Sequence, residues 1–308
     1  MTAARSGVLV AAKPAGATSF DVVAAVRRAL SVRRVGHAGT LDPDAVGVLP
    51  VLIGEATKLM PYLADQDKTY RVTVRFGVTT DTLDASGRVV TRRPVQGLDR
   101  TTVDLASRRF VGRIAQVPPM FSAVHHEGKR LYELAREGRQ VERAPRDVVV
   151  HAIDVHDVAE SAADLTVVCG KGTYVRVLVA DLGDALGFGA VVERLVRTRV
   201  GPFDLADAVA WESIAAGGRE ALWSRVLPAD AALSGWAVVE LDERAARAFV
   251  HGQAVPVTGP ARTTAGTLRR VHDVGGRLLG IGELAGAGGH VRPVRILHVD
   301  RPGTRVLP

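Results

Sequence analysis

Residues 68–76 alternate strictly between apolar and polar side chains, and this segment constrains the fold more than any other part of the chain. Tyr70, Val72, Val74 and Phe76 fall on one side, and Thr69, Arg71, Thr73 and Arg75 fall on the other. A repeat of two residues is that of a β-strand with one buried face and one polar face. The segment therefore predicts a sheet that packs on a core on one side and meets solvent or nucleic acid on the other. Tyr70 is expected on the buried face.

Strand and helix patterns follow one another without the regular alternation of a parallel βαβ fold. Helices are expected at 19–30, 55–63, 98–111, 131–137, 173–186 and 242–250, and strands at 8–12, 68–76, 148–155, 165–168 and 236–241. This order favours an α+β fold with a central mixed or antiparallel sheet flanked by helices. From residue 229 the pattern changes to short strands with glycine turns. We therefore expect two domains, 1–228 and 229–308, the second small and β-rich.

Residues 35–50 contain three glycines and two prolines. Glycine and proline at this density predict an irregular segment, and neither a regular helix nor a central strand is expected there. Asp42 directly precedes Pro43, which biases the backbone of Asp42 towards an extended conformation. A carboxylate on a rigid loop that contains glycine suits a positioned catalytic group. An ordinary Asp-Pro turn at the surface is the alternative.

The net charge of +7 comes almost wholly from arginine and favours an anionic partner, nucleic acid first among them. A genome rich in G and C, whose codons favour arginine, explains the same composition equally well. The lone Cys169 excludes an intramolecular disulfide and a multi-thiolate metal site, and it favours a reducing cytoplasm. No apolar run approaches the roughly 18 residues of a membrane span, no secretory signal is recognisable, and the histidines show no metal-site spacing.

The remaining chemical groups are a carboxylate, tyrosines and arginines. A base taken out of its stack needs a flat side chain to lie against and hydrogen bonds at its edge. Tyrosine offers both a ring and a hydroxyl. An arginine can pair with the carboxylate or bind a phosphate.

Eight motifs in order carry a resemblance to a known family. They are Lys13-Pro14-x-Gly16-x-Thr18-Ser19, Gly36-His37-Ala38-Gly39-Thr40-Leu41-Asp42-Pro43, Lys68-x-Tyr70, Thr80-Asp81-Thr82-x-Asp84, Pro119-x-Phe121-Ser122-Ala123, Gly128-Lys129-Arg130-Leu131-Tyr132, Lys171-Gly172-Thr173-Tyr174-Val175-Arg176 and Leu195-x-Arg197-Thr198. Between about residues 8 and 202 the chain resembles the TruB family of tRNA pseudouridine-55 synthases.

The resemblance implies the pseudouridine synthase fold and the isomerisation of uridine to pseudouridine at position 55 in the T-loop of tRNA. It implies a cytoplasmic enzyme that needs no metal or organic cofactor, binds the T-arm of tRNA and has no obligate protein partner. It also implies a PUA-like RNA-binding domain over residues 229–308, although no specific motif of that domain is found in the sequence.

Three catalytic positions follow from the resemblance. Asp42 matches the essential aspartate, Tyr70 matches the residue that stacks on the flipped base, and Arg176 matches the partner that orients the aspartate. Without the resemblance, Tyr70 is expected to be a core tyrosine, and a phosphate clamp is the alternative role for Arg176.

Five further positions are implied to bind the substrate: His37, Tyr174, Leu195, Lys13 and Asp84. From the residues alone, Leu195 is expected as a core residue of a helix, because large apolar residues are usually buried. Tyr174 is equally a packing residue at a helix start. The basic stretch 128–146 is either an RNA-clamping insertion or a solvated surface.

Two other functions compete with the tRNA-modifying enzyme. The first is a non-catalytic RNA-binding or tRNA-folding protein on the same scaffold. The presence of Asp42, Tyr70 and Arg176 together argues against it, because a pure binder needs none of them. The second is a synthase acting on rRNA or at guided sites, which would call for protein partners or a different C-terminal region.

Overall fold

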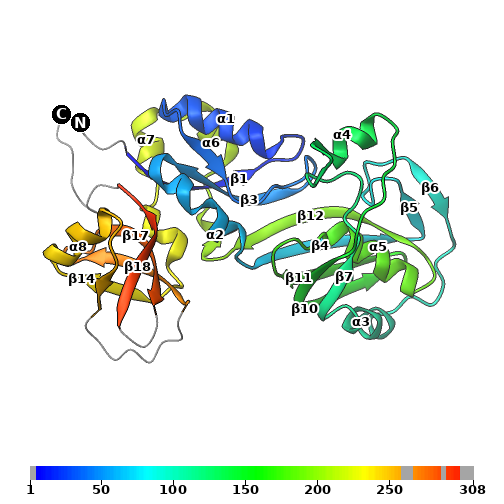
Figure 1. Cartoon of the computed structure of the whole chain (residues 1–308). Coiled ribbons are helices and arrows are strands. Elements are labelled where there is room, and N and C mark those ends of the chain that lie inside the picture. Colours follow the sequence, from blue (N-terminus) through cyan, green and yellow to red (C-terminus); the bar gives the residue numbers. More distant parts are fainter. Residues whose placement is uncertain (1–4, 258–265, 286–288, 299–308) are drawn as a thin grey trace.

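The computed structural model describes residues 5–257, 266–285 and 289–298, and two large sheets organise them (Figure 1). The larger sheet has nine strands, ordered β1-β3-β12-β4-β11-β10-β7, with β2 paired to β3 and β13 paired to β12. Its strands are β1 (Gly7–Lys13), β2 (Val35–His37), β3 (Val46–Ile53), β4 (Lys68–Phe76), β7 (Gly112–Gln116), β10 (Arg146–Ala159), β11 (Ala162–Cys169), β12 (Ala190–Val200) and β13 (Phe203–Asp204). Among the described strand pairs of this sheet, β3–β12 is the parallel one, so the central sheet is mixed, as expected.

Helices and hairpins cover this sheet and extend from it (Figure 1). The helices are α1 (Ser19–Leu30), α2 (Met60–Ala64), α3 (Arg100–Arg108), α4 (Leu131–Arg136), α5 (Val175–Ala185), α6 (Trp211–Ala216) and α7 (Arg219–Trp223), with 3-10 turns at Gly54–Leu59, Leu205–Asp207 and Ala229–Leu233. Two short hairpins are formed by β5 (Val78–Thr80) with β6 (Val89–Arg92) and by β8 (His125–His126) with β9 (Lys129–Arg130). The α+β class is therefore confirmed.

Strand β4 lies in the middle of the large sheet, between β12 and β11. Its burial alternates as the sequence predicts: Tyr70, Val72, Val74 and Phe76 are buried, and Arg71 and Arg75 are exposed. The buried residues join a core cluster with Leu178 and Leu182 of α5. The strand thus positions Tyr70 on the face of the sheet that also carries α5.

Helix α1 shows how local sequence sets its ends. Thr18 is the N-cap, and its hydroxyl accepts a hydrogen bond from the backbone N–H of Asp21, whose carboxylate accepts from the backbone N–H of Thr18. This capping box satisfies two of the free N–H groups at the helix start. The helix ends at Ser31, which adopts the left-handed conformation. The expected helix over 55–63 is instead the 3-10 turn Gly54–Leu59 followed by α2.

The expectation that residues 35–50 contain no central strand is wrong. Strand β3 lies between β1 and β12 although it includes Gly47 and Pro50. Gly47 has φ +111, and a Cβ there would lie 2.2 Å from the carbonyl oxygen of Arg197, so only glycine fits beside β12. Pro50 falls between the part of β3 paired with β2 and the part paired with β12. Its missing N–H is therefore not needed there.

The C-terminal region forms a separate five-stranded sheet, which confirms the expected β-rich region. Its strand order is β14 (Val238–Leu241), β16 (Leu268–Asp273), β17 (Leu278–Ala285), β18 (His290–Ile296) and β15 (Val255–Pro256), with helix α8 (Glu243–Val250) beside it. Leu278, Ile281 and Leu297 share a core cluster with Val8 and Leu59 of the larger region, so apolar contacts join the two parts. Of the expected second domain, residues 258–265, 286–288 and 299–308 lie outside the described part.

Among the helices that the structure describes, none has the length and apolar character needed to cross a membrane.

Candidate active site

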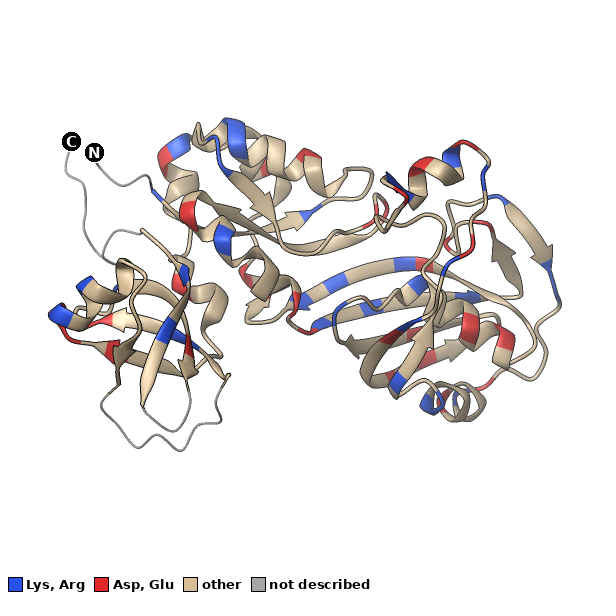
Figure 2. Ribbon diagram, in the orientation of Figure 1, with Lys and Arg blue, Asp and Glu red and all other residues tan. Residues whose placement is uncertain are grey.

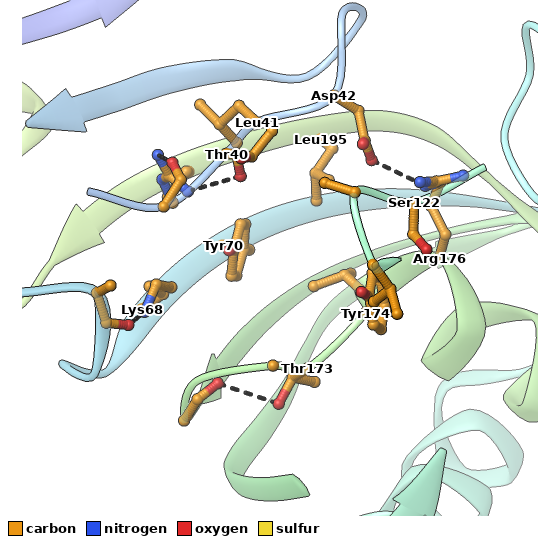
Figure 3. Close-up of a pocket in the computed structure, with 18 residues that line it drawn as sticks. Thr40, Leu41, Asp42, Lys68, Tyr70, Ser122, Thr173, Tyr174, Arg176 and Leu195 are labelled. Atoms are coloured by element: carbon orange, nitrogen blue, oxygen red, sulfur yellow. Dashed lines mark hydrogen bonds and ion pairs between the residues drawn. The ribbon is translucent and has the colours of Figure 1, made fainter. Parts of the chain in front are cut away.

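A cavity of about 360 Å³ opens where the Asp42 loop (residues 36–45) faces strands β4 and β12 and the start of α5 (Figure 3). A fourth wall comes from residues 122–124, in the connector between β7 and β10. Five of the predicted site residues line it: Asp42, Tyr70, Tyr174, Arg176 and Leu195. The fold therefore brings together residues that are up to 153 positions apart in sequence (195 − 42).

An ion pair joins Asp42 to Arg176 at one end of this pocket (Figure 3). The Nε of Arg176 lies 2.9 Å from Oδ2 of Asp42, and the side chains are 6% exposed for Arg176 and 41% exposed for Asp42. The other guanidinium nitrogens donate to the carbonyl oxygens of Thr82 (2.7 Å) and Phe121 (2.8 Å). The arginine is thus fixed by the backbone of two connectors, and it presents one N–H to a carboxylate that stays open to the pocket.

Arg197 supports the Asp42 loop from below. It is 1% exposed, and its Nε donates to the carbonyl of Val48 at 2.8 Å. Its terminal nitrogens donate to the carbonyls of Gly39 (3.0 Å) and Thr40 (3.3 Å). One buried guanidinium thus bonds three backbone carbonyls, two before Asp42 and one after it, and fixes the backbone of the loop that carries Asp42.

Lys13 and Ser19 hold the other side of the same loop. Lys13 is 1% exposed, and its ammonium donates to the carbonyls of Pro14 (2.8 Å), Ala17 (2.6 Å) and Pro43 (2.8 Å). Burial lowers the pKa of Lys13 to about 8, partly offset by the nearby carboxylates of Asp44 and Asp42. The hydroxyl of Ser19 and the backbone of Leu41 exchange hydrogen bonds. Asp42 is therefore held between two fixed neighbours.

Tyr70 and Leu195 form the floor of the pocket, from adjacent strands (Figure 3). Tyr70 is 7% exposed, and burial raises the pKa of its phenol, while the Arg197 cation beside it acts in the opposite direction. The phenol is therefore protonated at neutral pH. Leu195 lies in strand β12, so its expected place in a helix is wrong. The short segment 190–196, in which apolar residues flank Glu193 and Arg194, does not distinguish a strand from a helix by its pattern alone.

Tyr174 is the N-cap residue of α5. Its backbone is held by Gln116, a residue that belongs to none of the sequence motifs given above. The buried Gln116 of β7 accepts from the N–H of Tyr174 at 2.9 Å and donates to its carbonyl at 3.3 Å. This two-point contact places the ring of Tyr174 in the pocket wall (Figure 3).

The remaining predicted substrate-binding residues lie outside the lining. Asp84 approaches from the side, with Oδ2 3.8 Å from Nη1 of Arg176, while its Oδ1 accepts from Thr82 and Ser86. Lys13 lies beneath the Asp42 loop with its donors directed to carbonyls. His37 is in β2, where burial lowers the pKa of its imidazole.

Sequence reasoning assigned no role to four residues that shape this site. These are Lys68, Gln116, Ser122 and Arg197. Lys68 lines the pocket, donates to the carbonyls of Ala64 and Gln66, and has a pKa lowered to about 8 by burial. Three of the four stand inside quoted motifs, so their presence was visible in the sequence, but their burial and their partners were not.

Within the described residues no group of three or more His, Cys, Asp and Glu side chains is arranged to hold a metal ion. Cys169 is buried, and burial raises the pKa of its thiol to about 11, as expected for a core residue without an activating base. Lys and Arg recur along β4 and β12 and in the segment around α4 (Figure 2). Of these cations, Lys68 and Arg197 line the pocket, together with Arg176 of α5.

Comparisons with known proteins place this arrangement. The fold matches the crystal structure of a Cbf5-Nop10-Gar1 complex with a TM-score of 0.72 and 25% identity, over 96% of this chain and 84% of that one. It also matches the structure of an H/ACA RNP bound to a substrate RNA containing 2′-deoxyuridine, with a TM-score of 0.73 and 23% identity over 96% of this chain and 86% of that chain. The fold and the pocket thus define one class of protein, which the family profile identifies as the pseudouridylate synthases.

Sequence comparison narrows the class to one family. The profile of the TruB family pseudouridylate synthase N-terminal domain matches residues 27–175. Profiles of the tRNA pseudouridylate synthase B C-terminal domain and of the pseudouridine synthase II TruB C-terminal region match residues 176–234 and 237–297.

Curated relatives agree. The chain is 51% identical over 254 residues to the tRNA pseudouridine synthase B of Symbiobacterium thermophilum, covering 82% of this chain and 83% of that protein. It is 45% identical over 296 residues to the protein of the same name from Pseudomonas aeruginosa, covering 95% and 96%. The chain belongs to the TruB family of pseudouridylate synthases.

Proposed function

We propose that this protein isomerises uridine to pseudouridine at position 55 in the T-loop of tRNA. The observation that carries the proposal is the half-open carboxylate of Asp42, paired with the buried Arg176 above Tyr70, in a chain of the TruB family. The curated relatives are named tRNA pseudouridine synthase B, which supports tRNA as the substrate. The finer assignment to the T-arm rests on the sequence motifs.

The reaction breaks the bond between N1 of the uracil and C1′ of the ribose, turns the uracil, and forms a bond between C5 and C1′. The proton leaves C5 and N1 gains one, so atoms and electrons balance without an oxidant or a co-reactant. Among the described residues that line the pocket, Asp42 is the one carboxylate, and we assign it to the reacting nucleotide. Its ion pair with Arg176 holds it in place at the pocket, which is the preorganisation that transition-state stabilisation needs.

The target base must leave the RNA stack to reach Asp42, because the pocket lies below the surrounding loops. Tyr70 then supplies a ring for the uracil to lie against, and Leu195 beside it supplies an apolar contact. Since the phenol of Tyr70 is protonated at neutral pH, it acts as a stacking surface and a neutral hydrogen-bond donor. We assign His37, Tyr174 and Asp84 to substrate binding as well, with Asp84 acting through Arg176.

Lys13 supports substrate binding from beneath the Asp42 loop, through its bond to the carbonyl of Pro43. The division into a catalytic domain (1–228) and a PUA-like RNA-binding domain (229–308) is supported by the two separate sheets. We place the protein in the cytoplasm, where tRNA is its partner, and expect it to act without a protein partner and without a metal or organic cofactor.

The test is direct. An unmodified tRNA transcript is incubated with the purified protein, and pseudouridine is mapped by carbodiimide treatment and primer extension. We expect one stop at position 55 and none with Asp42→Asn, while tRNA binding by the variant stays close to that of the wild type because phosphate contacts supply much of the affinity. Absence of the stop with the wild-type protein, or full activity of Asp42→Asn, would refute the assignment.

The same experiment separates the competing functions. A non-catalytic RNA-binding or folding protein would bind the transcript and leave no pseudouridine. A synthase acting at guided sites would modify no free tRNA. Sequence identity is 25% to the Cbf5-Nop10-Gar1 complex and 23% to the H/ACA RNP, against 45–51% to the two proteins named tRNA pseudouridine synthase B.

A further inference from the structure

The hydroxyl of Ser122 is a buried polar group of the pocket without a hydrogen-bond partner among the described residues. Ser122 is 6% exposed and lies in the connector that follows β7. Its backbone groups are both used: the N–H donates to Met120 at 3.0 Å, and the carbonyl accepts from the N–H of Tyr132 at 3.1 Å. Only the side-chain oxygen is left over.

Buried hydroxyls are nearly always hydrogen-bonded, because leaving one unpaired loses its hydration without compensation. A neighbouring pocket residue shows the ordinary outcome. Thr173 also lines the cavity, and its hydroxyl donates to the carbonyl of Gly170 at 3.1 Å. Ser122 differs because its hydroxyl has no such partner among the described residues, although Ser122 lines the same cavity. An unpaired donor and acceptor at this position points to a polar group on the pocket's ligand.

The position of Ser122 indicates which part of a nucleotide it meets. The carbonyl of the preceding residue, Phe121, accepts from Nη2 of Arg176 at 2.8 Å, and Nε of the same arginine holds Asp42. Ser122 therefore lies at the Asp42 end of the pocket, on the side of Arg176 and Tyr174 (Figure 3). Within the proposed function, we place Asp42 beside C1′ of the target uridine. The group next to it is consequently the ribose, while the uracil lies over Tyr70.

We propose that Ser122 binds the ribose of the target uridine through a hydrogen bond between its Oγ and the 2′-hydroxyl. Both groups can donate and accept, so the pair is satisfied in either direction. The contact would hold the sugar beside Asp42 and would also distinguish RNA from DNA, which lacks this hydroxyl. This inference rests on the proposed function, because it takes uridine in RNA as the occupant of the pocket.

The test combines Ser122→Ala with a change in the RNA. Two T-arm stem-loop RNAs are compared, one with uridine and one with 2′-deoxyuridine at the target position, and the Kd of wild-type protein and variant is measured for both. With the ordinary RNA, kcat/KM for pseudouridine formation is measured as well. We expect Ser122→Ala to lower kcat/KM and to weaken binding of the ordinary RNA by about 10-fold, the size of one hydrogen bond. Binding of the 2′-deoxy RNA should not weaken further.

The control is Ser224→Ala, which makes the same chemical change at an exposed serine bonded to Ala221, far from the pocket in sequence. It should change neither measurement. Equal losses by Ser122→Ala on both RNAs would show that the hydroxyl does not meet the 2′-hydroxyl, and no loss on either RNA would show that it binds nothing. If the wild type forms no pseudouridine at all, the proposed function fails. The Kd comparison still reports whether Ser122 contacts the sugar.

Discussion

Two irregular segments border the pocket, and they are built in opposite ways. The Asp42 loop is fixed by buried donors from outside itself, chiefly Lys13 and Arg197. The connector between β7 and β10 (residues 117–145) has most of its charged side chains exposed, and its ion pairs, such as Lys129 with Glu137, lie at the surface. Buried cations therefore hold the loop that carries Asp42, whereas most cations of the connector are exposed to solvent. The carboxylate of Asp42 is thus fixed by buried hydrogen bonds, while the charges of the connector are held only by exposed ion pairs.

Replacing Arg197 should remove one of the buried donors that fix the Asp42 loop, and we expect it to have the largest effect on stability and activity. Arg197→Met leaves the carbonyls of Val48, Gly39 and Thr40 without their donor, and buried unsatisfied acceptors cost about 1–3 kcal/mol each. We expect about 3–5 kcal/mol lower stability in urea unfolding, together with a large loss of activity. The matched control is Arg199→Met, an exposed arginine of the same strand bonded to Gly201, which should change stability by less than about 1 kcal/mol. Equal losses in the two variants would contradict the role of Arg197.

Arg176 connects the two segments, because it bonds Asp42 of one and the carbonyl of Phe121 of the other. Arg176→Lys keeps the charge but cannot span three partners. We expect kcat to fall about 100-fold, as for a catalytic group displaced by about 1 Å, with the Kd for tRNA within about twofold of the wild type. Single-turnover rates and filter binding measure the two quantities. A variant with normal kcat would show that Arg176 is not needed to aim Asp42, and Arg194→Lys, exposed on β12, is the control.

A smaller effect is expected from pH. Both stability and activity should depend on the protonation of Lys13, which bonds to the Asp42 loop. Its pKa is about 8 in the folded protein against 10.5 in the unfolded chain, so the unfolded state binds more protons between these values. The free energy of unfolding therefore rises with pH between about 8 and 10.5, because the folded protein no longer has to bury a charged ammonium group once Lys13 is neutral. The neutral amine has one N–H fewer, however, and three carbonyls to serve.

We therefore expect kcat to fall a few-fold as pH rises through about 8, because the bond to Pro43 weakens, while stability moves in the opposite direction. Lys68 has a similar pKa, so the comparison is the wild type minus Lys13→Met in both pH profiles. A difference profile that is flat between pH 7 and 10 would mean that Lys13 does not titrate in this range or does not influence the loop.

Several parts of the molecule were predictable from the sequence for identifiable reasons. The two-residue repeat of β4 and the capping box at Thr18 depend only on residues close together in sequence, so the sequence alone predicts them. Asp42, Tyr70 and Arg176 were found because their motifs stand in order along the chain, and the fold brings all three to one pocket. Their catalytic roles remain predictions until the substitutions are made.

The rest depended on partners that are distant in sequence. Strand β3 accepts Gly47 and Pro50 because β12, about 150 residues later, and β2 pair with different parts of it. The burial of Arg197 could not be predicted from a hydrophobic pattern. Its partners are backbone carbonyls, and because every residue has one, the sequence does not show which of them an arginine will contact. Gln116 is likewise visible only through the backbone of Tyr174.

The smallest effect is expected from the exposed charges of the connector between β7 and β10. Lys129 and Arg139 both pair with Glu137 at the surface, where water and salt screen such pairs, so alanine at either position should leave the unfolding free energy nearly unchanged. If these cations bind phosphates, each substitution should weaken tRNA binding a few-fold at low salt and reduce the slope of log K against log salt by about 1. Glu137→Gln is the matched control, because it frees both cations and should strengthen binding. An unchanged salt slope in both alanine variants would show that the segment is only a solvated surface, the alternative that the sequence left open.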